Sequence, residues 1–279
     1  THNPLANNFG DSLFSIFGSQ FTALTLADTF LFAAILYAAW RYSAEQISRQ
    51  SRLEQEFRSA QEVQRLLIPA NPPATPGFSV ETVYLPATEV GGDFFHIQPN
   101  NDGSLLIVSG DVSGKGLKAA MTVSAIMGAL RGCPARRPND VLAYLNRVLH
   151  GNISGFAACT VALIAPGGSL TLANAGNIPP YCNGKELALE PGLPLGIEPE
   201  ISYTETTHQL NSGDRLTFIS DGVVEATNPQ RELFGFDRTQ AICNEPAASI
   251  AGAAKAFGQQ DDISVISIAI QPRPVAATV

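Results

Sequence analysis

The chain has 279 residues, 45% of them hydrophobic, which is enough for a sizeable buried core and excludes a disordered protein. Its formal net charge is −8 and it has no run of basic residues, so nucleic acid is excluded as a partner. The four cysteines are scattered without a Cys-x-x-Cys pair, which indicates buried free thiols in a reducing compartment rather than a zinc site or a disulfide framework.

The N-terminal part divides into a polar and an apolar stretch. Residues 1–20 show no sustained period, and because the chain begins at Thr1 rather than Met we expect them to be an irregular remnant of an upstream region. Residues 21–42 are almost all apolar, and about 20 residues suffice to span a bilayer. Arg41 and the arginines after it would lie on the cytoplasmic side. Asp28 favours the alternative, a buried or interfacial helix, but we predict a transmembrane helix at 21–42.

The next segment, residues 43–68, contains neither Gly nor Pro and is predicted to continue the helix. Its apolar stripe is irregular, at Ile47, Leu53, Phe57, Ala60, Val63 or Gln64, and Leu67. Two interpretations stay open: a solvated helix packed on the following domain, or a parallel coiled-coil signalling linker that would join two chains as a homodimer. Prolines from Pro69 to Pro76 mark a boundary, so we expect a domain at 69–273 and a tail at 274–279.

From Phe78 onward the sequence consists of short β-like runs and two groups of helices. The predicted strands are Phe78–Tyr84, Phe94–Gln98, Leu105–Val108, Ala157–Ala165, Leu170–Ala173, Tyr203–Leu210, Arg215–Ile219 and Ser264–Ile270. The predicted helices are Leu117–Arg131, Asn139–Leu149, Asp237–Cys243 and Ala247–Phe257. Tight turns such as Asn183-Gly184 imply antiparallel pairing. Strands with segregated helices favour α+β layers over a parallel βαβ sheet.

A glycine-rich stretch at Ser109–Met121 admits three interpretations: a phosphate loop, a dinucleotide-binding turn, or a turn whose carboxylate holds a metal. The spacing of Gly110 from Gly-Lys is one residue too short for a phosphate loop, and Gly116 stands where such a loop needs Ser or Thr. A dinucleotide turn needs a βαβ unit and an acidic residue on the next strand, but the next acid, Asp140, begins a predicted helix.

Acidic residues in turns at strand ends favour the metal interpretation. They are Asp93 after Gly91-Gly92, Asp111 after Gly110, Asp221 before Gly222, and the pair Asp261-Asp262 after Gln260. Glycine permits a close approach of the backbone, and carboxylates with backbone carbonyls are the ligands that Mg²⁺ and Mn²⁺ prefer. A turn or capping role is commoner for any single acid, but four such acidic turns in the same context favour a metal site.

Six motifs follow one another along residues 63–270. They are Glu89-Val-Gly-Gly-Asp-Phe-Phe, Gly110-Asp-Val-Ser-Gly-Lys-Gly-x-x-Ala-Ala, Asn174-Ala-Gly-Asn-x-Pro-Pro, Gly192-Leu-Pro-Leu-Gly-Ile, Ser220-Asp-Gly-Val-x-Glu-Ala and Gln260-Asp-Asp-Ile-Ser. In these motifs the sequence resembles bacterial metal-dependent serine/threonine protein phosphatases, in the sporulation-protein-E and sigma-regulator branch of the type 2C superfamily. The resemblance implies a four-layer α/β/β/α sandwich of two antiparallel sheets flanked by helices.

The resemblance also implies a site with two divalent cations, Mn²⁺ or Mg²⁺. Asp111 would bridge both, Asp93 and the carbonyl of Val112 would hold one, and Asp221 and Asp261 the other. Beside these ligands would lie Asp262, Gly92 and Gly222, and the roles of Asp261 and Asp262 could be exchanged. Lys115 would contact phosphate or remain a solvated turn residue. Many members of the family have His where this chain has Asn177, from which we expect altered loop bonding rather than inactivity.

The implied activity is hydrolysis of phosphoserine or phosphothreonine in a protein by a metal-activated water, with Asp111 and Asp93 acting through that water. The implied substrate is a phosphorylated anti-sigma-factor antagonist. With the predicted transmembrane helix, the enzyme would lie at the bacterial inner membrane with its phosphatase domain in the cytoplasm. The alternative is a catalytically weak or inactive signalling module that keeps the fold and binds a partner protein.

Overall fold

The computed structural model describes residues 12–16, 19–68, 72–153 and 155–271. The expected tail at 274–279, the expected start of the domain at residue 69 and the first part of the expected remnant at 1–20 lie outside the described residues. The chain divides into two compact units, Thr1–Glu56 and Phe57–Val279.

The first unit contains two short strands and most of a long helix. β1 (Ser12–Ile16) and β2 (Ser19–Thr22) pair antiparallel, in a region where we expected irregular structure. The helix α1 (Ala23–Leu67) has 45 residues and contains neither Gly nor Pro, the residues that most often interrupt a helix. The sequence therefore correctly predicts one continuous helix through residues 43–67.

The predicted transmembrane helix at 21–42 is not supported. Among the described residues, no helix has a stretch both long and apolar enough to cross a membrane. The apolar part of α1 contains Asp28 and gives way to charged residues from Arg41 onward.

The end of α1 belongs to the second unit and packs on its core. Gln64 and Ile68 are buried, and Leu67 contacts the buried cluster between the sheets. For residues 57–68 the structure therefore supports the interpretation of a helix packed on the domain. Residues 43–56 lie in the first unit, where the coiled coil stays a prediction.

The second unit is built on two antiparallel sheets of five strands each. The first sheet has the order β10 (Glu205–Gln209), β7 (Ser169–Ala175), β6 (Ala157–Ile164), β5 (Leu105–Val112) and β4 (Asp93–Pro99). The second has the order β3 (Phe78–Leu85), β12 (Ile263–Ile270), β11 (Arg215–Ile219), β8 (Tyr181–Cys182) and β9 (Lys185–Glu186). Every pairing is antiparallel.

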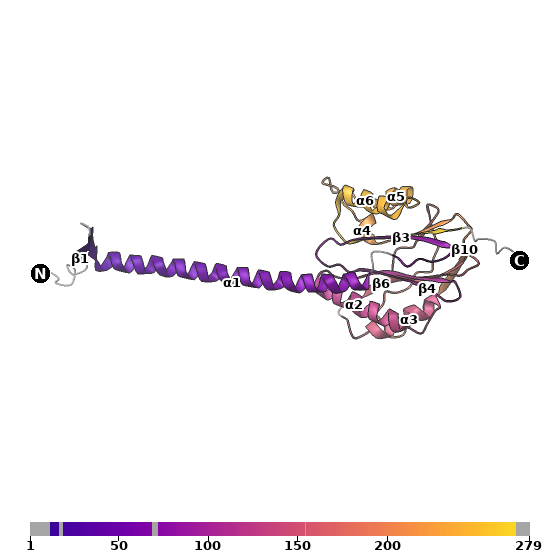
Figure 1. Ribbon diagram of the computed structural model, residues 1–279, viewed down its shortest axis with the longest axis horizontal. Helices are drawn as coiled ribbons and strands as arrows, with labels where there is room; N and C mark the ends of the chain where they lie inside the picture. The colour runs from indigo at the N-terminus through magenta and orange to yellow at the C-terminus, as the bar shows by residue number, and fades with distance from the viewer. Residues whose placement is uncertain (1–11, 17–18, 69–71, 154, 272–279) are drawn as a thin grey trace. The chain divides into compact units, whose positions relative to one another are not determined.

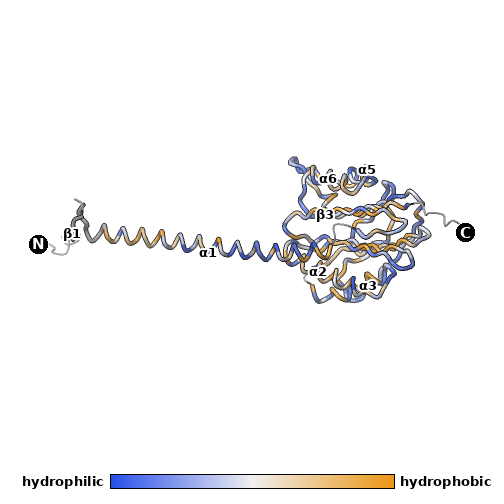
Figure 2. The backbone as a smooth tube through the Cα atoms, in the orientation of Figure 1, coloured by the Kyte–Doolittle hydropathy of each residue, from blue (hydrophilic) through white to orange (hydrophobic). Residues whose placement is uncertain are grey.

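Helices cover the outer face of each sheet. The first sheet is covered by α2 (Leu117–Gly132) and α3 (Pro138–Leu149), and the second by α4 (Asp221–Val224), α5 (Gly235–Ile242) and α6 (Ala247–Gly258) (Figure 1). The result is the expected four-layer α/β/β/α sandwich, preceded by a long helix. Hydrophobic residues concentrate along the strands of both sheets, and the connecting loops are mostly hydrophilic (Figure 2).

Two local differences from the predicted elements matter for the site. The strand β5 does not end at Val108, as predicted, but continues to Val112, because β6 pairs with it along its whole length and β4 pairs with it as far as Asp111. Gly110 fits there because a Cβ would collide with Phe94 and with the Ala158 carbonyl. The elements β8, β9 and α4 have two to four residues each and are too short for a periodic pattern.

Candidate metal centre

One end of the first sheet brings two predicted acids together. Asp93 is the first residue of β4 and Asp111 the second-last residue of β5, and they are direct partners in the antiparallel register. Side chains of directly opposed residues project to the same face of a sheet, about 5 Å apart at Cβ. The pairing of β4 with β5 therefore places both carboxylates side by side on one face of the first sheet.

The third acid comes from the second sheet. After β11, Ser220 precedes α4, and Asp221 is the first residue of that helix. Ser220 is fixed to the start of β12 by two hydrogen bonds: its amide donates to the Ser264 carbonyl, and its hydroxyl accepts from the Ser264 amide. One carboxylate oxygen from each of Asp93, Asp111 and Asp221 lies within 4.8 Å of the others.

The crowding of these acids changes their proton affinity. Burial, together with the charges of Asp111 and Asp262, raises the pKa of Asp93 well above its usual value. Burial and the neighbouring Asp221, Asp261 and Asp262 raise the pKa of Asp111 to about 7. The pKa of Asp221 is also raised, by burial and by Glu225 and Asp261. Positive charge at this point would relieve the repulsion among the carboxylates.

One atom in the cluster indicates what would bind there. Asp93 is only 1% exposed, and its Oδ2 is a buried oxygen without a hydrogen-bond partner among the described residues. Buried carboxylate oxygens are normally paired with a donor or a cation. The carboxylates of Asp93, Asp111 and Asp221 together form the hard-oxygen donor set that Mg²⁺ and Mn²⁺ prefer, so the residues fit a divalent cation.

Asp262 supports the loop before Asp93 and is itself only 6% exposed. Its Oδ1 accepts a hydrogen bond from the Ala87 amide (2.8 Å) and its Oδ2 one from the Gly92 amide (2.7 Å). Both oxygens are thereby engaged by backbone N–H groups. Gly222 packs against the backbone of Asp262 so closely that a Cβ would overlap its carbonyl.

Asp261 lies beside the three-carboxylate cluster rather than in it. Its Oδ2 forms an ion pair of 2.7 Å with Lys115 Nζ, which also donates to the Gln260 carbonyl (3.3 Å). The Lys115 side chain is 62% exposed. An exposed ion pair contributes about 0–1 kcal/mol, so this contact holds the loops together only weakly. Lys115 therefore pairs with a predicted ligand instead of being fully solvated.

Gly92, just before β4, allows the backbone to approach the end of β5 closely at the site. A Cβ at this position would lie 2.7 Å from Asp111 Oδ1 and 2.7 Å from the Val112 carbonyl oxygen. The Gly92 carbonyl accepts from the Val112 amide (3.1 Å). The Val112 carbonyl, a predicted ligand, therefore lies next to Gly92 and to the Asp111 carboxylate.

Asn177 holds the loop after β7 against β5. Its Nδ2 donates to the Ser109 carbonyl (3.2 Å), and its amide donates to Asn174 Oδ1 (2.8 Å). The side chain thus acts in loop bonding and is directed to a residue two positions before Asp111.

Sequence reasoning missed two residues that contact the loop before Asp93. Gln64, near the end of α1, bonds to both backbone groups of Gly91 and to the Tyr84 hydroxyl. Burial and the charges of Asp262 and Asp93 raise the pKa of Tyr84. The one sequence signal was the place of Gln64 in the apolar stripe, where a polar residue is unexpected.

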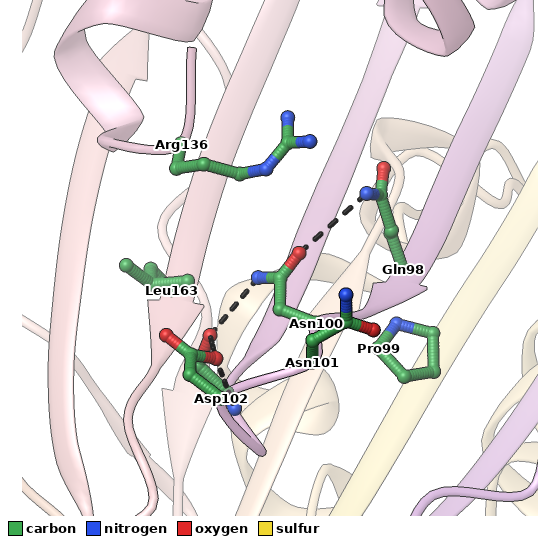
Figure 3. Close-up of a pocket in the computed structure, with 8 residues that line it drawn as sticks. Gln98, Pro99, Asn100, Asn101, Asp102, Arg136 and Leu163 are labelled. Atoms are coloured by element: carbon green, nitrogen blue, oxygen red, sulfur yellow. Dashed lines mark hydrogen bonds between the residues drawn. The ribbon is translucent and has the colours of Figure 1, made fainter. Parts of the chain in front are cut away.

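A separate surface pocket of about 360 Å³ lies at the far end of the hairpin formed by β4 and β5 (Figure 3). It is lined by polar residues that include Gln98, Asn100 and Arg136. Pro99 pairs with Leu105 at this end, six residues from the Asp93–Asp111 pair, which corresponds to about 20 Å along the strands. The pocket is therefore not part of the acidic cluster.

Comparisons with known proteins agree with this geometry. The family model of Stage II sporulation protein E (SpoIIE) matches residues 101–271. Phosphoserine phosphatase RsbU of Bacillus subtilis is 29% identical over 208 residues, which cover 70% of this chain and 62% of RsbU. The chain thus spans less than two thirds of that relative.

Two solved structures share the fold. The RsbU and RsbW domains of Rv1364c from Mycobacterium tuberculosis have a TM-score of 0.62 and 26% identity, covering 75% of this chain and 64% of that one. The SiaA-PP2C domain of Pseudomonas aeruginosa has a TM-score of 0.64 and 20% identity, covering 78% of this chain and 97% of that one, a likeness of fold alone. With the family match over more than half of its length, the chain belongs to the SpoIIE family, in the SpoIIE/RsbU branch of the PP2C phosphatases.

Proposed function

We propose that this chain is a metal-dependent phosphoserine/phosphothreonine protein phosphatase in bacterial signalling. The observation that carries the proposal is the cluster of Asp93, Asp111 and Asp221, in which one oxygen of Asp93 is buried and has no hydrogen-bond partner among the described residues. The neighbouring negative charges that help to raise their pKa values would also attract a divalent cation, which would displace protons from the carboxylates when it binds.

The proposed ligands are those of the family pattern. In this pattern both cations would share Asp111, Asp93 and the Val112 carbonyl would hold one of them, and Asp221 and Asp261 would hold the other. When bound, two Mn²⁺ or Mg²⁺ ions would supply Lewis-acid charge that activates water and offsets the charge of the phosphoryl oxygens. Asp262 would keep the Ala87–Gly92 loop in place through its two backbone hydrogen bonds.

The proposed substrate is a phosphorylated anti-sigma-factor antagonist. Its support is the similarity to RsbU, which is named a phosphoserine phosphatase, and to a structure that contains RsbU and RsbW domains. A preference for such a protein would distinguish a dedicated signalling enzyme from a general phosphatase.

The test is phosphate release from a phosphoserine-containing antagonist protein with Mn²⁺, with Mg²⁺ and with a chelator. We expect Asp111→Asn to lower the rate at least about a hundredfold, because it removes charge that both cations would share. Asp140→Asn, which neutralises an exposed acid on α3, is the matched control and should retain the wild-type rate.

Equal rates for the wild type and Asp111→Asn would contradict the proposal. If the wild type releases no phosphate in any metal but binds the antagonist, and this binding survives Asp221→Asn, the alternative signalling module would be the correct interpretation.

A further inference from the structure

The end of α1 reaches the metal centre through one side-chain amide. Gln64 Nε2 donates to the Gly91 carbonyl (2.9 Å), and Gln64 Oε1 accepts from the Gly91 amide (3.3 Å). The side chain thereby pairs with both backbone groups of one residue, as a neighbouring strand would. Gln64 is 3% exposed, so water does not compete for these bonds.

The paired residue has little freedom to move. A Cβ on Gly91 would overlap the Asp262 carboxylate and the Tyr84 hydroxyl, so the backbone is pressed against both groups. Gln64 Nε2 also lies 3.3 Å from the Tyr84 hydroxyl oxygen. Gly91 is therefore held by Gln64 on one side and by Asp262 and Tyr84 on the other.

Gly91 is followed by Gly92 and Asp93, two residues of the site. The Gly92 amide donates to Asp262, the Gly92 carbonyl accepts from Val112, and Asp93 is the buried member of the carboxylate cluster. A rotation of the peptide between Gly91 and Gly92 would turn the Gly92 amide away from Asp262 and would displace the backbone that leads to Asp93. Groups that orient ligands in this way change metal affinity by about 10- to 100-fold when they are removed.

We propose that Gln64 is a positioning residue for the metal centre: its amide, on the last turn of α1, fixes the Gly91-Gly92 backbone and through it Asp93 and Val112. The effect of Gln64 on metal binding rests on the proposed function, whereas its effect on the geometry of the loop does not. It makes the end of α1 a structural part of the site rather than a linker that only leads to it.

A cavity beside the pairing supplies the matched control. Gln61 and Gln64 both line a cavity of about 370 Å³ between α1 and β3. Gln61 is on the same helix, almost one turn earlier. Replacing either residue by Met keeps a side chain of similar length in the same cavity, but only the change at Gln64 removes the bonds to Gly91.

The experiment compares the full chain with its Gln64→Met and Gln61→Met variants in two measurements without substrate. Mn²⁺ affinity is measured by calorimetry, and amide hydrogen exchange of residues 86–94 is measured in chelator. We expect Gln64→Met to weaken Mn²⁺ binding by at least about tenfold and to accelerate exchange at Gly92, and Gln61→Met to change neither.

Unchanged affinity and exchange in Gln64→Met, or equal changes in both variants, would overturn the proposal. If Gln64→Met does not fold, Gln64→Asn serves in its place, because it keeps an uncharged amide but is one methylene group shorter and therefore cannot make both bonds to Gly91. A wild type that binds no Mn²⁺ would defeat the proposed function, whereas the exchange comparison would still decide the role of Gln64.

Discussion

Asp93 and Asp111 are direct partners across β4 and β5, and the pKa of each carboxyl is raised by burial and by the other acids around it. Two neighbouring strands thus hold two mutually repelling carboxylates at directly opposed positions. The two carboxylates stay close despite this repulsion. Gly92 has no side chain to separate it from Asp111 and Val112, and the pairing of β5 with β4 and β6 fixes the backbone of β5 on both sides.

This arrangement predicts a pH-dependent stability in chelator. An Asp in the unfolded chain titrates near 3.8, and Asp111 in the folded protein titrates at about 7. Because the folded pKa is the higher one, the stabilisation by proton binding is complete below about pH 4 and is lost as the pH rises to about 7. At about pH 8 the free energy of unfolding of Asp111→Asn should therefore be greater than that of the wild type by on the order of 2 kcal/mol, and its unfolding temperature should be higher.

Thermal unfolding in chelator from about pH 5 to about pH 8 measures this effect. Added Mn²⁺ should stabilise the wild type at the upper end of the range and leave Asp111→Asn nearly unchanged. The same pH dependence in both proteins would show that Asp111 does not carry the effect.

Adjacent acids with different partners predict different phenotypes for Asp261→Ala and Asp262→Ala. Loss of Asp262 leaves the buried Gly92 amide and the more exposed Ala87 amide without their acceptor, which should cost about 1–3 kcal/mol of unfolding free energy and also weaken Mn²⁺ binding. Loss of Asp261 removes a partly exposed ion pair with Lys115, so stability should change by less than about 1 kcal/mol while Mn²⁺ binding weakens. Chemical denaturation and calorimetry measure the two effects, and a stable Asp262→Ala with normal loop exchange would refute this division of roles.

Much of the second unit could be predicted from the sequence, because its strands of five or more residues and the helices α2, α3, α5 and α6 leave a periodic pattern. The acids of the site were also recognisable, since each belongs to a short motif. The Asp93–Asp111 pairing and the role of Gln64 depend on register and on contacts between residues 27 positions apart in the chain. The spacing of residues along the sequence does not show which distant residues will contact each other.

The contact of Gly92 with Asp111 and Val112 predicts that Gly92→Ala is damaging out of proportion to its size. The new methyl group would lie 2.7 Å from Asp111 Oδ1 and from the Val112 carbonyl, so one of these oxygens must move, at a cost of about 1–3 kcal/mol. Mn²⁺ affinity and phosphatase rate should both fall by at least about tenfold. Gly128→Ala is the control, because this exposed glycine in α2 has nothing within 4 Å of its Cβ position, and the change should raise stability by up to about 1 kcal/mol. If Gly92→Ala kept the wild-type Mn²⁺ affinity, β4 and β5 could move apart at this end without loss of metal binding, which would contradict the prediction.

The exposed stripe on the first unit's part of α1 predicts a dimer. Ile47 is 66% exposed there and belongs to the predicted coiled-coil stripe, so pairing of two helices would remove it from water. In sedimentation experiments on the full chain we expect a dimer for the wild type, and for Ile47→Asp a dissociation constant at least about tenfold higher, because pairing would bury an unpaired charge. Arg49→Asp introduces the same side chain about 200° around the helix and should remain dimeric. A monomeric wild type at high concentration, or an Ile47→Asp variant that still dimerises with normal affinity, would contradict the coiled coil and leave residues 43–56 as a solvated helix.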